Sequence, residues 1–292
     1  MPRPRLKASI DIRVGLEVRN GRVSMAWRII EKGNQDIFTN LAVEEALARV
    51  NAKLENKMNT LRFWRASSAV VMGRFQCVHK EADIQFCKEH SIPIARRFTG
   101  GGTVYQDSGN LNFSICADQK KPYVKRTLPE LYEVFIGGIA RGLQEIGISA
   151  RFDPFRSCIR IGRKKITGTA GWVKQGVSFI HGTLLIDSNL ETLQRCLHVP
   201  EGQPAYLRDG KIRCMESKRD IVTSIQREVA GCPSNARIKS SIVRSIERIA
   251  GTSAEEGELT EEEERMAQSL YQSRYSQAKW NMGTPVPENG SR

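Results

Sequence analysis

The stretch RRFTGGGTVYQDSGNLNFS, residues 96–114, decides how this sequence is interpreted. Three consecutive glycines (Gly100, Gly101 and Gly102) follow two arginines (Arg96 and Arg97), with strand-like sequence on both sides. Glycine adopts positive φ without cost and lets a ligand approach the main chain, so that successive N–H groups can point at an anion. A wide hairpin or bulge needs only one or two glycines. The stretch therefore predicts a phosphate or carboxylate cradle, flanked by arginine forks that match its oxygens.

The common phosphate-binding motifs do not explain this stretch. The sequence contains no GxxxxGK followed by Ser or Thr. Its glycines lead into the strand-like TVYQ, whereas GxGxxG of a dinucleotide site opens a helix. The sequence thus excludes a P-loop and a Rossmann site.

Composition limits the class of protein. The 292 residues can form one large domain or a domain with an appendage. Lys and Arg number 45 against 32 Asp and Glu, and the formal charge of +13 favours an anionic partner. The seven cysteines include no CxxC pair, and their odd number without a signal peptide predicts reduced thiols and a cytoplasmic location. No apolar run approaches the ~18 residues of a membrane span.

Helices and strands are predicted in blocks. The pattern indicates a helix over 40–50, a long helix over 128–148 and helices from residue 190 onward. It indicates strands near 60–66, 69–75, 92–98 and 111–117, and a meander over 157–187. Blocks of this kind, without strict βαβ alternation, predict an α+β fold whose mixed or mostly antiparallel sheet is flanked by helices.

Two residues of the meander are candidates for chemistry. Lys165 begins the strand-like KITGTA, and His181 lies in HGTLLID. By spacing alone, Lys165 is a solvated hairpin residue and His181 a structural histidine. Beside a phosphate cradle, however, Lys165 can supply a fixed positive charge to an acyl phosphate or to a pentacoordinate phosphorus.

The glycine stretch, KKITGTA and HGTLLID, in this order and spacing, resemble the lipoate-protein ligase family of the biotin/lipoate protein ligase superfamily. The resemblance runs from about residue 25 to 283 and implies a class II biotin/lipoate ligase-like fold. It also implies two steps. Mg²⁺ and ATP adenylate lipoate or octanoate, and the acyl group then passes to a lysine of an acceptor lipoyl-domain protein, either an H protein or an E2-like 2-oxoacid dehydrogenase subunit.

The same resemblance implies roles for individual residues. Lys165 would be catalytic and would touch both the acyl carboxyl group and the α-phosphate. The ATP contacts would include Arg97, Gly102, Thr103, Val104, Tyr105 and Lys165. The acyl pocket would be lined by Lys165, Arg96, Gly100, Gly101, His181, Gly182, Thr183, Trp64, Val71 and Gly73. The metal ligands stay unknown.

The resemblance also implies a domain organisation. Residues 1–24 would be a flexible basic extension and residues 25–283 the catalytic domain, with a core of about 55–245 and a helical C-terminal part. Residues 284–292 would be a disordered tail. The chain resembles an archaeal-type catalytic subunit without the C-terminal accessory domain, so a separate accessory subunit is expected.

Departures from the family keep alternatives open. Gln106 replaces a histidine, Cys77 replaces the Asn of GRFQN, and Ser157-Cys158 replaces an Asn-Asp pair near the metal, for which Asp153 is a substitute. Cys158 is the candidate nucleophile of an ATP-independent octanoyl or lipoyl transferase, which forms a cysteine thioester from a carrier-protein donor. A buried structural thiol is the simpler interpretation of Cys158.

The positive charge would also suit a nucleic-acid-binding protein, but no helix-turn-helix or basic aromatic stripe supports one. Neither nucleic acid nor a membrane is expected as a partner.

Overall fold

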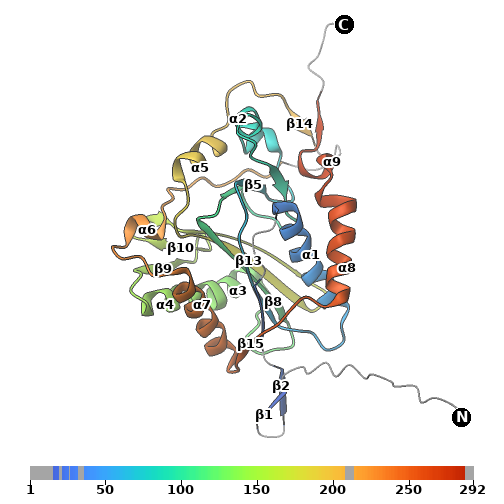
Figure 1. The fold of residues 1–292 in the computed structure, drawn as a ribbon, viewed down its shortest axis with the longest axis vertical. Helices are drawn as coiled ribbons and strands as arrows, with labels where there is room; N and C mark the ends of the chain where they lie inside the picture. The colour runs from blue at the N-terminus through green and yellow to red at the C-terminus, as the bar shows by residue number, and fades with distance from the viewer. Residues whose placement is uncertain (1–15, 20–21, 26, 32–35, 208–213, 287–292) are drawn as a thin grey trace, which may run out of the picture.

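The computed structural model describes residues 16–19, 22–25, 27–31, 36–207 and 214–286 (Figure 1). Helices cover both faces of a central sheet, with α1 and α8 side by side on one flank and α4 and α7 together on the other (Figure 1). None of the helices in these ranges combines the length and the apolar composition needed to cross a bilayer.

The central sheet is mixed, as the sequence predicted. Its order is β12-β13-β8-β4-β3-β15. The pairs β12/β13, β13/β8 and β8/β4 are antiparallel, whereas β4/β3 and β3/β15 are parallel. The strands are β12 (Thr167–Lys174), β13 (Val177–Leu185), β8 (Asn110–Asp118), β4 (Thr60–Trp64), β3 (Trp27–Glu31) and β15 (Ala254–Glu256). Every residue of β8 and β13 is buried, because helices cover both faces of the sheet at its centre.

Two smaller sheets position the predicted cradle and the predicted lysine. Strand β5 (Ala69–Met72) pairs in parallel with β6 (Ile94–Arg96) and antiparallel with β7 (Val104–Gln106). Residues 97–103, here called the glycine loop, therefore connect two neighbours of one strand. The third sheet is antiparallel and contains β9 (Ala150–Asp153), β10 (Cys158–Ile161) and β11 (Lys164–Lys165).

The helices follow the predicted blocks, with two differences. The helix predicted over 128–148 is divided into α3 (Leu128–Leu131), a π-helical turn η2 (Tyr132–Ile136) and α4 (Gly137–Glu145). The helix predicted over 40–50 is α1 (Ile37–Lys53), and its N-cap is Asp36. The others are η1 (Val78–Lys80), α2 (Ile84–Glu89), α5 (Leu190–Leu197), α6 (Ile225–Glu228), α7 (Asn235–Ala250), α8 (Glu261–Leu270), η3 (Tyr271–Tyr275) and α9 (Ala278–Asn281).

The two largest of four apolar clusters lie between these layers. The larger one packs the central sheet against α4 and α7 through residues such as Phe113, Phe135 and Ile242, each 0% exposed. The second packs α1 and α8 on the opposite side, with Leu41, Leu47 and Leu270. The site described below borders the second core, where Thr99 of the glycine loop contacts His181 of β13.

Three expectations need correction or restriction. Residues 16–19 and 22–25 form a hairpin, β1 (Leu16–Arg19) with β2 (Arg22–Met25), within the expected flexible extension; residues 1–15 lie outside the described ranges. At the other end, β16 (Thr284–Pro285) pairs with β14 (Tyr206–Leu207) inside the expected disordered tail, whose residues 287–292 are not described. The expectation of reduced cysteines is wrong for one pair, because a disulfide joins Cys77 and Cys214.

Candidate functional site

Two adjoining cavities meet at the glycine loop. The first has a volume of about 430 Å³ and the second of about 870 Å³. Both are lined by Lys165, and by Thr103 and Val104 at the end of the loop. The predicted site residues that line the first cavity are Trp64, Val71, Arg97, Gly101, Gly102, Thr103, Val104, Lys165, His181, Gly182 and Thr183. The fold therefore brings together residues that are more than one hundred positions apart.

Four residues predicted to contact ATP or the acyl chain do not line the first cavity. Tyr105 lies on the second cavity, where its hydroxyl donates to Ser68 Oγ at 3.2 Å. Gly73 and Gly100 belong to the scaffold of the loop and line neither cavity.

Arg96, the fourth, is fully buried away from the cavities. Its guanidinium donates to the carbonyl oxygens of Gly73 at 3.0 Å, Gln76 at 2.6 Å and Asn281 at 3.1 Å. Through these bonds Arg96 connects residues 73–76, which follow β5, to α9. The expectation that Arg96 lines the acyl pocket is therefore wrong, because carbonyl groups inside the protein occupy its donors.

Arg97 supports the glycine loop from within. Its Nη2 donates to the carbonyl oxygens of Gly100 at 2.6 Å and Gly102 at 2.8 Å, and its Nη1 donates to that of Val71 at 3.2 Å. Burial lowers the pKa of Arg97 to about 10. The arginine fork thus organises the backbone of the loop by binding its carbonyl groups.

Close packing explains some of the loop glycines and not others. A Cβ atom on Gly73 would lie 2.1 Å from the carbonyl oxygen of Gly101. Gly101 itself has a φ of 84°, in the left-handed region that favours glycine. A Cβ on Gly100, by contrast, would meet nothing closer than 3.8 Å. Backbone conformation and close approach require glycine at 73 and 101, whereas space alone does not require it at 100.

A buried polar network forms the inner wall of the first cavity. Glu44, on α1, is 1% exposed and accepts hydrogen bonds from Trp64 Nε1 at 2.9 Å and from Ser114 Oγ. Its other oxygen lies 2.6 Å from His181 Nδ1, and His181 Nε2 lies 2.9 Å from Thr99 Oγ1. Burial alone would raise the pKa of Glu44, but His181 and Arg62 together bring it below its usual value. The histidine predicted from sequence is therefore oriented between α1 and the glycine loop.

Lys165 lies where the two cavities join. Its backbone pairs with Arg160 on β10, its N–H donates to the carbonyl of Ile221 at 2.8 Å, and its carbonyl accepts from Thr223 N at 3.0 Å. The residue is half-buried, and burial lowers the pKa of its amine. Lys165 is therefore held from both sides of its strand and is not a solvated hairpin residue.

Cys158 and Asp153 do not support the roles considered for them. Cys158 is 0% exposed, lines neither cavity, and has a pKa raised by burial, which keeps its thiol protonated. Asp153 accepts from Arg160 Nε at 2.7 Å and from the amides of Phe155 and Arg156, so its oxygens already have partners. Ser157 does line the first cavity. Among the described residues no group of three His, Cys, Asp or Glu side chains could hold a metal ion.

Sequence reasoning missed two contributors to the site. Glu44 could have been found, because a carboxylate on the face of a helix that also carries Leu41 and Leu47 signals a buried partner. Ser217 could not. It lines both cavities and its Oγ accepts from Thr103 N at 2.8 Å, but no periodicity or motif surrounds it.

Known proteins resemble this chain over most of its length. Lipoate-protein ligase A subunit 1 of Thermoplasma acidophilum is 29% identical over 232 residues, covering 76% of this chain and 84% of the relative. The octanoyltransferase LipM of Symbiobacterium thermophilum is 27% identical over 278 residues, covering 88% and 98%. Relatives of both kinds therefore share the sequence pattern.

Solved structures resemble the fold as well. A crystal structure of lipoate-protein ligase A bound with ATP has a TM-score of 0.74 at 26% identity, over 88% of this chain and 98% of that one. The bi-partite lipoate protein ligase of Thermoplasma acidophilum, described with its E2 lipoyl domain, has a TM-score of 0.75 at 28% identity, over 91% and 100%. The family model of the lipoyl protein ligase A/B catalytic domain matches residues 36–247. The chain belongs to this lipoyl protein ligase catalytic-domain family.

Proposed function

We propose that this protein is a lipoate-protein ligase, which adenylates lipoate or octanoate with ATP and transfers the acyl group to a lysine of an acceptor lipoyl domain. One observation carries the proposal: the half-buried Lys165 lies at the junction of two cavities, beside the glycine loop. A half-buried cation that lines both cavities can be reached by two anionic groups at once, whereas Lys218, which also lines both, is exposed. Relatives with the ligase name support the same function.

The first step brings two negative groups together. A carboxylate oxygen of the acyl substrate attacks the α-phosphorus of ATP, and the bond to pyrophosphate breaks. Lys165 would stabilise the charge on the phosphoryl oxygens, and the amides of the glycine loop would hold the phosphate chain. Arg97 would act indirectly by fixing the carbonyl groups of that loop. Mg²⁺ would arrive with the nucleotide, since this ion usually keeps the substrate phosphates among its ligands.

The acyl chain would occupy the inner part of the first cavity. Leu41, Trp64 and Val71 give that part apolar walls, and each is at most 3% exposed. An eight-carbon chain contributes ~0.8 kcal/mol per buried CH₂, so this contact would supply several kcal/mol of binding. Its carboxyl end would then face Lys165.

In the second step the amine of the acceptor lysine attacks the acyl carbonyl carbon, and AMP leaves. The acceptor lysine could enter through the second cavity, which also reaches Lys165. An archaeal neighbour is described as bi-partite and with an E2 lipoyl domain. By this likeness we propose a lipoyl-domain acceptor and a second, accessory subunit for this chain. The cytoplasmic location predicted from the sequence stays a proposal.

The transferase alternative has one observation in favour and one against. LipM octanoyltransferases are among the relatives. A thioester mechanism, however, needs an accessible thiolate, and Cys158 is buried with a raised pKa. We therefore prefer the ligase.

The test incubates the chain with ATP, lipoate and an apo lipoyl domain, and measures the acceptor by intact-mass spectrometry. A second reaction supplies synthetic lipoyl adenylate, so that transfer is measured even if adenylation needs an accessory subunit. A third omits ATP and supplies octanoyl carrier protein. Acceptor modification in the first or second reaction supports the ligase. Modification in the third alone would select the transferase, and this activity should then disappear in Cys158→Ala.

A further inference from the structure

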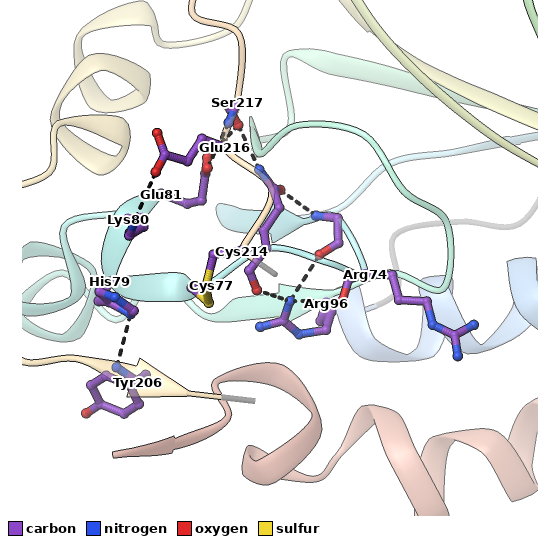
Figure 2. Close-up of a disulfide and its surroundings, with 12 residues drawn as sticks. Arg74, Cys77, His79, Lys80, Glu81, Arg96, Tyr206, Cys214, Glu216 and Ser217 are labelled. Atoms are coloured by element: carbon purple, nitrogen blue, oxygen red, sulfur yellow. Dashed lines mark hydrogen bonds and ion pairs between the residues drawn. A yellow bond between two sulfur atoms is a disulfide. The ribbon is translucent and has the colours of Figure 1, made fainter. Parts of the chain in front are cut away.

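A segment outside the predicted motifs lies directly on the glycine loop. We call residues 214–223 the strap. Its last residues pair with β11, where Lys165 N donates to Ile221 O at 2.8 Å and Thr223 N donates to Lys165 O at 3.0 Å. Its first residue, Cys214, is bound by a disulfide to Cys77, which follows β5 (Figure 2). The strap is thus attached at both ends across the loop.

Ser217, in the middle of the strap, occupies a donor of the glycine loop. Its Oγ accepts from Thr103 N at 2.8 Å and from Gln76 Nε2 at 3.0 Å, and donates to Glu81. The Ser217 N–H donates to the same buried carboxylate at 2.8 Å. A serine hydroxyl has one donor and two acceptor positions, so these three bonds satisfy it completely. The strap is therefore seated specifically.

The seat of Ser217 coincides with the proposed phosphate cradle. Thr103 N is one of the amides that the cradle would offer to an anion, and Ser217 Oγ already binds it. A Cβ atom on Gly102 would lie 2.9 Å from Ser217 Oγ, so the strap leaves no room above this glycine. A phosphate oxygen can reach the Thr103 amide only after Ser217 has moved.

The disulfide is the strongest link between the strap and the segment after β5. Beside it, Met215 N donates to Phe75 O at 2.9 Å, and Glu216 forms an exposed ion pair with Lys80 at 2.9 Å (Figure 2). Exposed ion pairs contribute little to stability, and one peptide hydrogen bond contributes modestly. Cutting the covalent link would leave this end of the strap held by these weak contacts, and the strap would then rest on the contacts of Ser217 and Arg219 with Glu81.

We propose that Cys77–Cys214 is a redox-controlled latch: in the oxidised protein it holds Ser217 on the Thr103 amide and so hinders nucleotide binding, and reduction by a dithiol frees the strap. The effect on nucleotide binding rests on the proposed function.

The exposure of the two cysteines indicates the order of the exchange reaction. Cys77 is 4% exposed and Cys214 is half-buried, so a thiolate of the dithiol attacks the Cys214 sulfur and the Cys77 thiolate leaves. The second thiol of the reductant then displaces Cys214 and closes a disulfide. Two electrons pass to the protein, and both cysteines end as thiols. The dithiol form of lipoate, the proposed acyl substrate, belongs to this class of reductant.

The experiment compares oxidised and dithiothreitol-reduced protein by three readouts. Alkylation under denaturing conditions, measured by mass, should label five cysteines before reduction and all seven after it. Hydrogen exchange should become at least tenfold faster at the Ser217 and Thr103 amides after reduction. Calorimetric titration with ATP should give an affinity at least tenfold higher for the reduced form.

Three variants separate the latch from general effects of reduction. Cys214→Ser should behave like the reduced protein in exchange and in ATP affinity, with or without dithiothreitol. Ser217→Ala keeps the disulfide, and in its oxidised form should bind ATP more tightly than the oxidised wild type. Cys232→Ser is the matched control, because Cys232 is a free, half-buried cysteine outside the strap, and it should keep the full response to reduction.

The outcomes distinguish the latch from the proposed function. Seven labelled cysteines before reduction, or unchanged exchange at Ser217 after it, would overturn the latch. A response to reduction that persists in Cys214→Ser would overturn it too. If exchange accelerates but ATP affinity does not change, the hindrance of nucleotide binding is wrong. If no form binds ATP at all, the proposed function fails, while accelerated exchange still supports the latch.

Discussion

At the scale of single residues, the surroundings of Lys165 favour the neutral form of its amine. Burial lowers the pKa of its amine, while Asp220 acts in the other direction and Arg156 and Arg160 add to the lowering. The proposed role needs the protonated form, because a neutral amine cannot stabilise phosphoryl charge. Because the pKa of Lys165 is lowered, its amine loses its proton, and the enzyme loses activity, at a lower pH than with a lysine of ordinary pKa.

This predicts an alkaline limb in kcat/KM for adenylation that begins below the usual lysine range. Lys165→Arg should move the limb to higher pH, since a guanidinium stays protonated, even if the rate falls. Lys165→Ala should lower kcat by about 10²–10³-fold, the usual loss when one stabilising group is removed from a transition state. ATP–pyrophosphate exchange measured against pH tests both variants. An unchanged limb in Lys165→Arg would assign the titration to another group.

Glu44 is a buried carboxylate whose charge is balanced inside the protein. It faces His181, Trp64 and Ser114, and Arg62 lies behind it, with a pKa that burial lowers to about 10. Because the folded-state pKa of Glu44 is below its usual value, the unfolded chain binds more protons in acid. The stability that Glu44 contributes is present above about pH 4.5 and is lost as pH falls through the folded-state pKa.

We expect Glu44→Gln to lower the free energy of unfolding at neutral pH by about 3 kcal/mol, because it leaves the buried Arg62 without a counter-charge. Below about pH 5, the free energy of unfolding of the variant should also fall less steeply with decreasing pH than that of the wild type. Urea unfolding at several pH values measures both effects. Glu55→Gln, on an exposed turn, is the control and should match the wild type. Equal acid dependence in Glu44→Gln would show that folding does not shift the pKa of Glu44.

At the scale of elements, the sequence pattern predicted those helices and strands that depend on residues close together in the chain. The helix at α1 and the strands on both sides of the glycine loop follow from periodicity and turn residues, and the structure confirms them. The meander predicted over 157–187 is instead divided between two sheets, because β10 and β11 pair beside β9 whereas β12 and β13 pair in the central sheet. The contacts of Arg96 could not be predicted, because its partners at Gly73 and Asn281 lie 23 and 185 positions away. Ser217 is similar. Its position over the loop depends on a disulfide and a buried carboxylate far away in sequence.

The packing of β5 against the glycine loop predicts a contrast between two glycines. Gly73→Ala should destabilise the protein by about 2–3 kcal/mol, because its Cβ would overlap the carbonyl oxygen of Gly101 at 2.1 Å. Gly100→Ala meets nothing closer than 3.8 Å and has no left-handed φ, so it should be neutral or stabilising by up to about 1 kcal/mol. Thermal unfolding of both variants makes the comparison. Equal losses would mean that the whole loop, and not one close approach, requires glycine.

At the scale of the whole molecule, charge and fold act on different steps. The chain carries a formal charge of +13, but charged groups that line the site, such as Arg97 and Glu44, have partners inside the protein. The surplus therefore bears less on the chemistry inside the cavities than on the approach of other molecules. A basic surface attracts acidic partners over distances set by the ionic strength, about 10 Å at 0.1 M salt.

The formal charge of +13 favours an anionic partner. If this partner is the acceptor lipoyl domain, salt should weaken its binding and leave the chemistry unchanged. Raising the salt from about 0.05 M to about 0.5 M should increase the KM for the acceptor about tenfold, because steering acts on the association rate. The kcat at saturating acceptor should stay within about twofold, since the charges around Lys165 are buried or paired and are screened much less. Starting from lipoyl adenylate removes the separate effect of salt on ATP binding. If the KM for the acceptor does not change with salt, or if kcat falls as salt is raised, the positive charge serves another partner.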